Sequence, residues 1–95
     1  MSAPRRPVTT VIVPPVDVDV DGVKATIVEV HAYTALDGGR RYIVACYLEH
    51  AGYRSQLFHV DAADNVELRR KLKVEAAKMR LQLAAGFTQP FQRIA

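Results

Sequence analysis

The stretch VDVDVDGVKATIVE, residues 16–29, decides the fold of this chain. Valine and aspartate alternate strictly up to Asp21-Gly22, a period-two pattern typical of a β-strand with one buried face. Asp-Gly is also the two-residue turn that most strongly indicates a β-hairpin. The stretch therefore predicts an antiparallel hairpin whose valines face the core. Its facing pairs are Val20–Val23, Asp19–Lys24, Val18–Ala25 and Val16–Ile27.

The same aspartates match the first half of a calcium-binding loop, in which alternating acids are followed by glycine. That loop requires an acid at its twelfth position, which is Val28 here, and Lys24 stands where an apolar residue is expected. A lysine would repel the cation, and without the twelfth acid the coordination is incomplete. We therefore predict no metal site and interpret the aspartates as the solvent face of the hairpin.

The remaining turns extend this hairpin into a sheet. The apolar phase changes at Ile27-Val28, which predicts a β-bulge that keeps both halves of the second strand on the buried face. The segments LDGGR (36–40) and HAG (50–52) are interpreted as three-residue loops ending in a left-handed glycine, and strands follow over 41–49 and 53–60. We predict a four-stranded antiparallel meander, with VTTVIVPP (8–15) as an additional short strand at an edge. The expected neighbours are Val28–Leu48, Val30–Cys46, Ala32–Val44, Phe58–Val44 and Val60–Tyr42.

After Asp61 the apolar period becomes that of a helix. Asp64 is a candidate N-cap, Glu67 stands three residues later in the capping-box position, and Gly86 is a natural stop. We predict one α+β domain over residues 1–95, with the helix packed on one sheet face. Its parts are a flexible arm (1–7), a sheet (8–60), a helix (64–85) and an apolar tail (86–95) that docks on the domain or on a partner. The buried stripe of the helix is Leu68, Leu72, Ala76, Met79 and Leu83.

Composition narrows the classes of function. The 95 residues include 13 basic and 10 acidic ones, a net charge of +3, and the single cysteine, Cys46, excludes an internal disulfide and favours a reducing compartment. No segment approaches the roughly 20 apolar residues of a membrane helix, so we expect a cytoplasmic protein without a membrane partner. Arginine outnumbers lysine, which suits a thermophile or a GC-rich genome. The chain has no glycine-rich phosphate loop, serine elbow or paired catalytic carboxylates, so we assign no catalytic residue and no cofactor.

The sheet face away from the helix is the predicted binding surface. Tyrosines presented outward by strands can stack on bases, and arginines at strand ends can contact phosphates. The leading hypothesis is a non-enzymatic homodimer that binds nucleic acid, single-stranded DNA or RNA, on this face. The basic helix, with six basic residues against two glutamates over 67–80, is a secondary contact. The residues assigned to the site are Tyr33, Tyr47, Tyr53, Arg40, Arg41 and Arg54.

Two alternatives stay open. Ile43, Ala45 and Leu57 on the same face favour a protein contact, so the sheet face or the tail could join copies of a homo-oligomeric assembly module. The third hypothesis is a small-molecule enzyme that uses Glu29 or a histidine. His31 and His59 would lie two strand spacings apart, about 10 Å, which is too far for a shared metal ion.

The predicted order of four meandering strands and one long helix resembles the topology of small single-strand-binding folds, such as the Whirly proteins and the transcriptional positive-cofactor family. This resemblance implies the fold and is in keeping with single-strand binding. It is a resemblance of topology, and it carries over no site residues.

Overall fold

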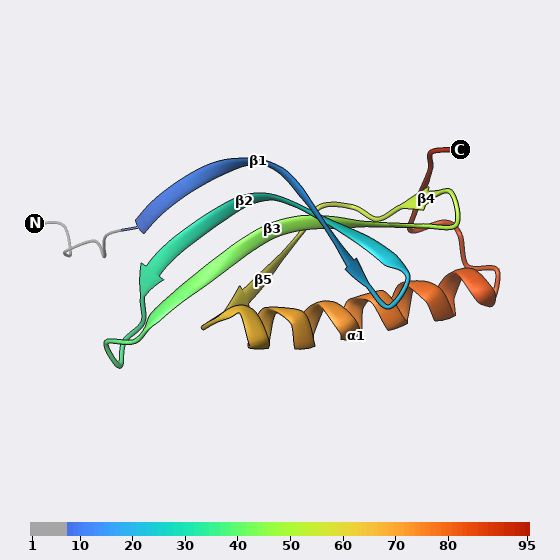
Figure 1. Cartoon of the computed structure of the whole chain (residues 1–95). Coiled ribbons are helices and arrows are strands. Elements are labelled where there is room, and N and C mark those ends of the chain that lie inside the picture. The colour runs from blue at the N-terminus through green and yellow to red at the C-terminus, as the bar shows by residue number, and fades with distance from the viewer. Residues whose placement is uncertain (1–7) are drawn as a thin grey trace, which may run out of the picture.

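A computed structural model describes residues 8–95, so the predicted flexible arm 1–7 lies outside the described residues. The strands form one antiparallel sheet, and the helix packs on its concave face (Figure 1). The predicted α+β class is confirmed. The elements are β1 (Val8–Val20), β2 (Val23–Thr34), β3 (Arg40–His50), β4 (Tyr53–Arg54), β5 (Phe58–Ala62), α1 (Asn65–Ala84) and β6 (Gln92–Arg93).

The first hairpin has the predicted register. Val20 faces Val23 and Asp19 faces Lys24 across the turn. Asp21 and Gly22 both have positive φ, 51° and 84°, which is the two-residue turn that matches the twist of a hairpin. The local turn chemistry was therefore sufficient to predict this pairing.

The predicted edge strand over 8–15 is present but is not separate, because β1 continues through Pro14-Pro15 and pairs with β2 on both sides of the prolines. The register shifts between Ile12 and Val16, so the two prolines fall in an irregularity of the ladder. Within the described sheet, β1 pairs only with β2, and an edge strand tolerates prolines because it needs hydrogen-bond donors on one side only.

The β2–β3 hairpin keeps the predicted face but not the predicted register. The bulge between Ile27 and Glu29 is confirmed. The loop, however, spans residues 35–39, since Thr34 faces Arg40, and its left-handed glycine is Gly38 rather than Gly39. The pairing is therefore displaced by two residues, so that Val30 faces Val44 and Ala32 faces Tyr42. A displacement by two leaves every side chain on its face.

The turn between β3 and β4 is shorter than predicted, and this places the first residues of β4 on the opposite face of the sheet. Ala51 and Gly52 (φ 51° and 82°) form a two-residue turn in place of the predicted three-residue loop, so Tyr53 faces His50 instead of Glu49. A displacement by one residue moves side chains to the opposite face. The predicted fourth strand is also divided, because residues 55–57 interrupt it. The backbone N–H of Ser55 donates to the carbonyl of Leu48, and its hydroxyl accepts from the N–H of Leu48, both at 2.8 Å.

After this interruption β5 rejoins β3, with Phe58 opposite Cys46 and Val60 opposite Val44. These pairs again differ by two residues from the predicted ones, so Phe58 and Val60 still face the helix. α1 begins at the predicted cap, where Oδ1 of Asp64 accepts the backbone N–H of Glu67 at 2.9 Å. The buried side chains of α1 pack against the sheet and complete the core. The core cluster consists of Val20, Val23, Ala25, Cys46, Leu48, Val60, Leu72, Ala76 and Met79.

The C-terminal tail docks on its own domain. β6 pairs with β4, Phe91 packs against the core, and the N–H of Ile94 donates to the carbonyl of Gly52 at 2.8 Å. All of these contacts lie at the end of the sheet where α1 ends (Figure 1).

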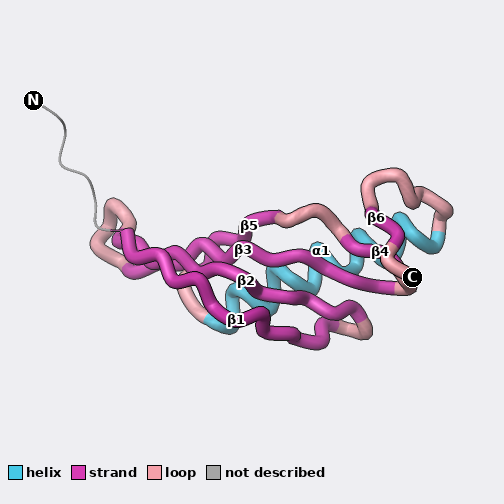
Figure 2. The backbone as a smooth tube through the Cα atoms, turned by 90° about the horizontal axis from the view of Figure 1, so that it is seen from above, coloured by secondary structure: helices cyan, strands magenta, loops and turns pink. Residues whose placement is uncertain are grey.

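The opposite end of the sheet extends past the start of α1, as both views show (Figures 1 and 2). We call residues 28–43 of β2 and β3, with their connecting loop, the arm. Every residue of the arm is at least partly exposed to solvent, whereas Val44, Ala45 and Cys46 directly after it are buried. The core therefore occupies one end of the molecule, and the arm projects from it.

Candidate functional site

The face of the sheet away from α1, here called the outer face, receives four of the six predicted site residues. Tyr33, Arg41 and Tyr47 lie on it by the register of β2 and β3, and Arg54 joins them because it faces Glu49. Arg40 is exposed at the end of the arm. Tyr53 is not on the outer face. It packs against the core on the helix side, since the one-residue change of register reverses its direction.

Arg41 and Tyr33 meet in a network that joins the sheet to the helix. Nε of Arg41 lies 2.8 Å from Oδ1 of Asp61 on β5, and its Nη2 lies 2.8 Å from Oε1 of Glu67 on α1. The hydroxyl of Tyr33 donates to the second carboxylate oxygen of Asp61. Nζ of Lys71 lies 3.3 Å from the Glu67 carboxylate. The charge of this guanidinium is already balanced by two carboxylates, which weakens its attraction for a phosphate.

The charges of this network shift its pKa values. The hydrogen bond to Asp61 raises the pKa of Tyr33, and the hydrogen bonds to Asp61 and Glu67 raise the pKa of Arg41. The Tyr33 hydroxyl, followed by Arg41, lowers the pKa of Asp61, while Arg41 and then Lys71 lower the pKa of Glu67. Each group is held in the charge state that the pairing requires.

Tyr47 is covered on one side by Arg54, whose guanidinium carbon lies 4.8 Å from the centre of the tyrosine ring. The same guanidinium lies 3.1 Å from the Glu49 carboxylate, which also pairs with Lys24 at 3.5 Å. A cation over an aromatic face occupies the surface on which a base would stack. Stacking on Tyr47 would therefore require Arg54 to move, or a base to stack on the guanidinium itself.

On the outer face, acids outnumber lysines and arginines, and each lysine and arginine there is already paired. Its three lysine and arginine side chains, Lys24, Arg41 and Arg54, all contact carboxylates. Glu29 pairs with His31. The five acids that the register places on this face are Asp17, Asp19, Glu29, Glu49 and Asp61. The face therefore repels phosphates more than it attracts them.

The three residues proposed for an enzyme do not form one site. Glu29 and His31, two residues apart on β2, contact each other, whereas His59 lies on the opposite side of Ala45 from Glu29. Cys46 is fully buried, and burial, with the charge of Glu75 as a second cause, raises the pKa of its thiol to about 11. Among residues 8–95 no group of three histidine, cysteine, aspartate or glutamate side chains is arranged to hold a metal ion.

The side of α1 that faces solvent has the opposite charge. Every exposed charged residue of the helix is basic, whereas the two glutamates are partly buried and paired, Glu67 with Arg41 and Lys71 and Glu75 with Lys78. We call the exposed set the basic helix side: Arg69, Arg70, Lys73, Lys78 and Arg80. The sequence indicated this charge, but only the structure shows that both acids of the helix are paired with basic side chains.

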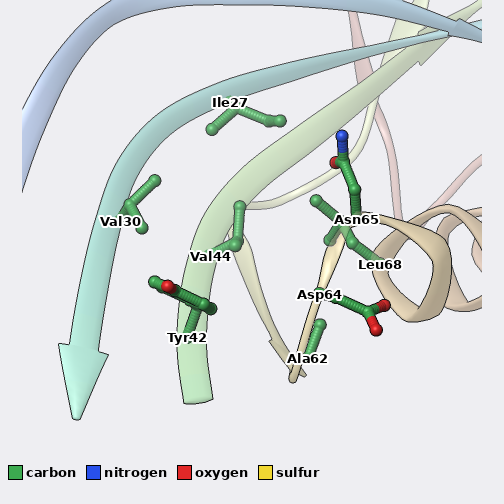
Figure 3. A pocket seen from close by; sticks show the side chains of 8 residues that line it. All are labelled: Ile27, Val30, Tyr42, Val44, Ala62, Asp64, Asn65 and Leu68. Atoms are coloured by element: carbon green, nitrogen blue, oxygen red, sulfur yellow. The ribbon is translucent and has the colours of Figure 1, made fainter. Parts of the chain in front are cut away.

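A hollow of about 310 Å³ opens where the arm leaves the helix. Figure 3 shows its side chains, with Ile27, Val30 and Val44 coming from the sheet and Leu68 from the helix. Tyr42 and Ala62 complete the apolar lining, and Asp64 and Asn65 at the start of α1 are its polar members. The sequence did not predict this hollow. Its apolar residues follow the pattern of buried core positions, and the helix was expected to cover the whole sheet face.

The chain matches no protein-family model, no curated protein and no solved structure. Across the part of the chain that the structure describes, no helix has the length and apolar character needed to cross a membrane.

Proposed function

We propose that this protein binds nucleic acid through the basic helix side, without base-specific contacts. The observation that carries the proposal is the separation of charge on the folded chain. The exposed charges of α1 are all basic, while the outer face of the sheet has more acids than bases and no unpaired lysine or arginine among the described residues. A polyanion is attracted to the first surface and repelled by the second.

Three members of the basic helix side, Arg69, Arg70 and Lys73, form no ion pair with a described residue, so they can contact phosphates without losing an existing partner. Asp19 and Asp21 line a shallow hollow together with Arg69 and Lys73. The acidic turn of the first hairpin therefore bounds the surface at one edge. Arg70 and Lys78 lie away from this turn, and we assign the main contacts to that side.

This proposal keeps the predicted class of ligand and moves the contact from the tyrosines to the helix. The exposed members of α1 include no aromatic residue that could stack on a base. Without stacking, a preference for single strands loses its physical basis. We therefore expect single-stranded and double-stranded DNA to bind with similar affinity.

The test is fluorescence anisotropy with labelled single strands and duplexes between about 50 and 200 mM salt. With about three phosphate contacts, the affinity should fall with a log–log salt slope of about −2 for single strands and about −3 for duplexes. Arg70→Glu and Lys78→Glu should each weaken binding about tenfold or more. Arg93→Glu is the matched control, since it reverses the charge of an exposed arginine that lies on β6 and outside the basic helix side.

The variant Tyr47→Ala distinguishes binding through the basic helix side from binding through the outer face of the sheet. The helix proposal expects no loss with this variant, whereas binding by the sheet face requires a loss. If binding is absent at low salt, if Tyr47→Ala abolishes it, or if the chain binds anionic vesicles but no nucleic acid, the proposal is wrong.

A further inference from the structure

The side of the arm that continues the helix-facing surface of the sheet is apolar and uncovered. We call the arm underside the surface formed by Val30, Ala32 and Tyr42 of the arm together with Ile27 and Val44 at its base. All but Val44 are partly exposed, although residues of the same kind and direction at the other end of the sheet are fully buried. The hollow at the start of α1 lies within this surface. An uncovered apolar sheet face of this kind marks an interaction site.

No described segment of the chain itself is placed to cover the arm underside. α1 begins at Asn65, at the base of the arm, and runs away from it (Figure 1). The C-terminal tail is held at the far end of the sheet by its pairing with β4. The described residues 8–95 therefore supply no cover for the arm underside.

The tip of the arm carries the group that fits the hollow. Leu36, in the loop between β2 and β3, is 90% exposed, the highest value among the exposed large hydrophobic residues. Arg40, next to this loop, is exposed and forms no ion pair with a described residue. The hollow offers the complementary features, an aliphatic lining and the exposed carboxylate of Asp64 at its polar end. One chain thus carries both an apolar tip beside a positive charge and an apolar hollow beside a negative one.

We propose that two copies of the chain pack arm underside against arm underside, with Leu36 of each copy seated in the hollow of the other. The tip and the hollow lie at opposite ends of the same arm. A two-fold axis between two antiparallel arms therefore brings each tip to the hollow of the other copy. Two sheet faces packed in this way lie about 10 Å apart, the usual spacing of a sandwich. In the same arrangement Arg40 of each copy approaches Asp64 of the other.

The first experiment measures the oligomeric state of the full chain by light scattering and sedimentation. The wild type should be a dimer at micromolar concentration. Leu36→Asp should weaken dimerisation roughly a hundredfold, because a carboxylate would enter an apolar hollow. Its own fold should be intact, since Leu36 is 90% exposed and outside the core. An unchanged circular-dichroism spectrum and thermal midpoint at the lowest concentration check this point.

Two matched control variants test whether the dimer contact is specific to Leu36. Leu57→Asp and Leu81→Asp introduce the same charge at exposed leucines, 55% and 71% exposed, in the 55–57 segment beside the sheet and on the helix. Both variants should remain dimeric. A monomeric wild type, or a dimer that Leu57→Asp or Leu81→Asp disrupts while Leu36→Asp does not, would overturn the proposal.

The second experiment tests the position of Leu36 directly and does not depend on a destabilising change. Chains with Leu36→Cys are mixed with chains with Asn65→Cys, at the polar end of the hollow, and oxidised mildly. The native Cys46 does not compete, because it is fully buried. A disulfide-linked dimer should form in the mixture and should be at least about tenfold less abundant in either variant alone. Equal cross-linking in all three samples, or none in the mixture, contradicts the proposed contact.

Discussion

Nε of Arg41 on β3 lies 2.8 Å from Oδ1 of Asp61 on β5, and the other end of the same guanidinium reaches Glu67 in the first turn of α1. One side chain on β3 thus connects to β5 and to α1, which follow it 20 and 26 residues later in the chain. This contact joins the first turn of the helix to the sheet, and it also occupies an arginine that the sequence suggests for ligand binding.

Arg41→Gln should make stability less sensitive to acid. The pKa values of Asp61 and Glu67 are lowered on folding, so the folded state binds fewer protons than the unfolded chain at low pH. This contribution is present above the unfolded values of about 4, and it is lost as the pH falls through the lowered folded values. In urea titrations from about pH 7 to about pH 2, the variant should have the lower midpoint at neutral pH, and the two curves should converge in acid.

Lys78→Gln is the control for this experiment, since it removes only an exposed pair with Glu75 at 3.4 Å. Parallel pH profiles for the wild type and Arg41→Gln would show that the Arg41 network does not contribute to the pH dependence of stability.

Ala51→Asn should stabilise the protein. Ala51 has a φ of 51°, a left-handed conformation that costs an ordinary residue about 1–2 kcal/mol and that asparagine tolerates. We expect a gain of about 1 kcal/mol in the free energy of unfolding, measured by urea denaturation. Gly52→Ala, at the neighbouring position with φ 82°, should have the opposite sign and a similar size. If both variants shift stability in the same direction, this turn does not have the described geometry.

Leu72→Ala should cost about 2–5 kcal/mol, because the side chain is 1% exposed at the centre of the helix stripe and its removal leaves a cavity. Val66→Ala on the same helix is the control. This valine is 77% exposed, and its loss should change stability by no more than about 0.5 kcal/mol. Equal losses in the two variants, measured by chemical denaturation, would contradict the described orientation of α1.

Cys46 should react with a thiol reagent only when the domain unfolds. Its pKa of about 11 gives roughly a hundredfold less thiolate at pH 8 than an ordinary thiol has, and its burial adds a steric barrier. The rate of labelling with a chromogenic disulfide should therefore rise steeply in urea, in step with circular dichroism. Rapid labelling in the native state would place Cys46 at the surface and contradict the register of β3.

The first hairpin and the helix show what local sequence was able to predict. Both φ-positive positions of the Asp21-Gly22 turn are filled by residues that tolerate them, so turn chemistry and alternation lead to the same register. The Asp64 cap and the stripe through Leu72 and Met79 are also local signals, and the structure confirms both. The register of the β2–β3 hairpin differs from the predicted one by two residues. The predicted faces of its side chains are still correct, because a displacement by two keeps each side chain on its face.

The face of Tyr53 could not be predicted in the same way. It depends on whether the turn before it has two residues or three, and alanine in a left-handed conformation at Ala51 is not a residue that sequence rules expect there. Because the turn is one residue shorter than predicted, Tyr53 lies on the core side and not on the outer face. The pairing of Arg41 with Asp61 and Glu67 was hidden for a different reason, because partners 20 and 26 residues apart meet only when the helix is docked.

The sequence by itself determined the α+β class, the hairpin at residues 16–29, the helix and the residues of the core cluster. These follow from turn chemistry, capping and periodicity, which act over a few residues. Only the tertiary structure decided which charges are paired, which side of the molecule is basic, and where the curved sheet leaves the helix and opens the hollow beneath the arm. Those properties depend on distances between segments far apart in the chain, and no local pattern encodes them.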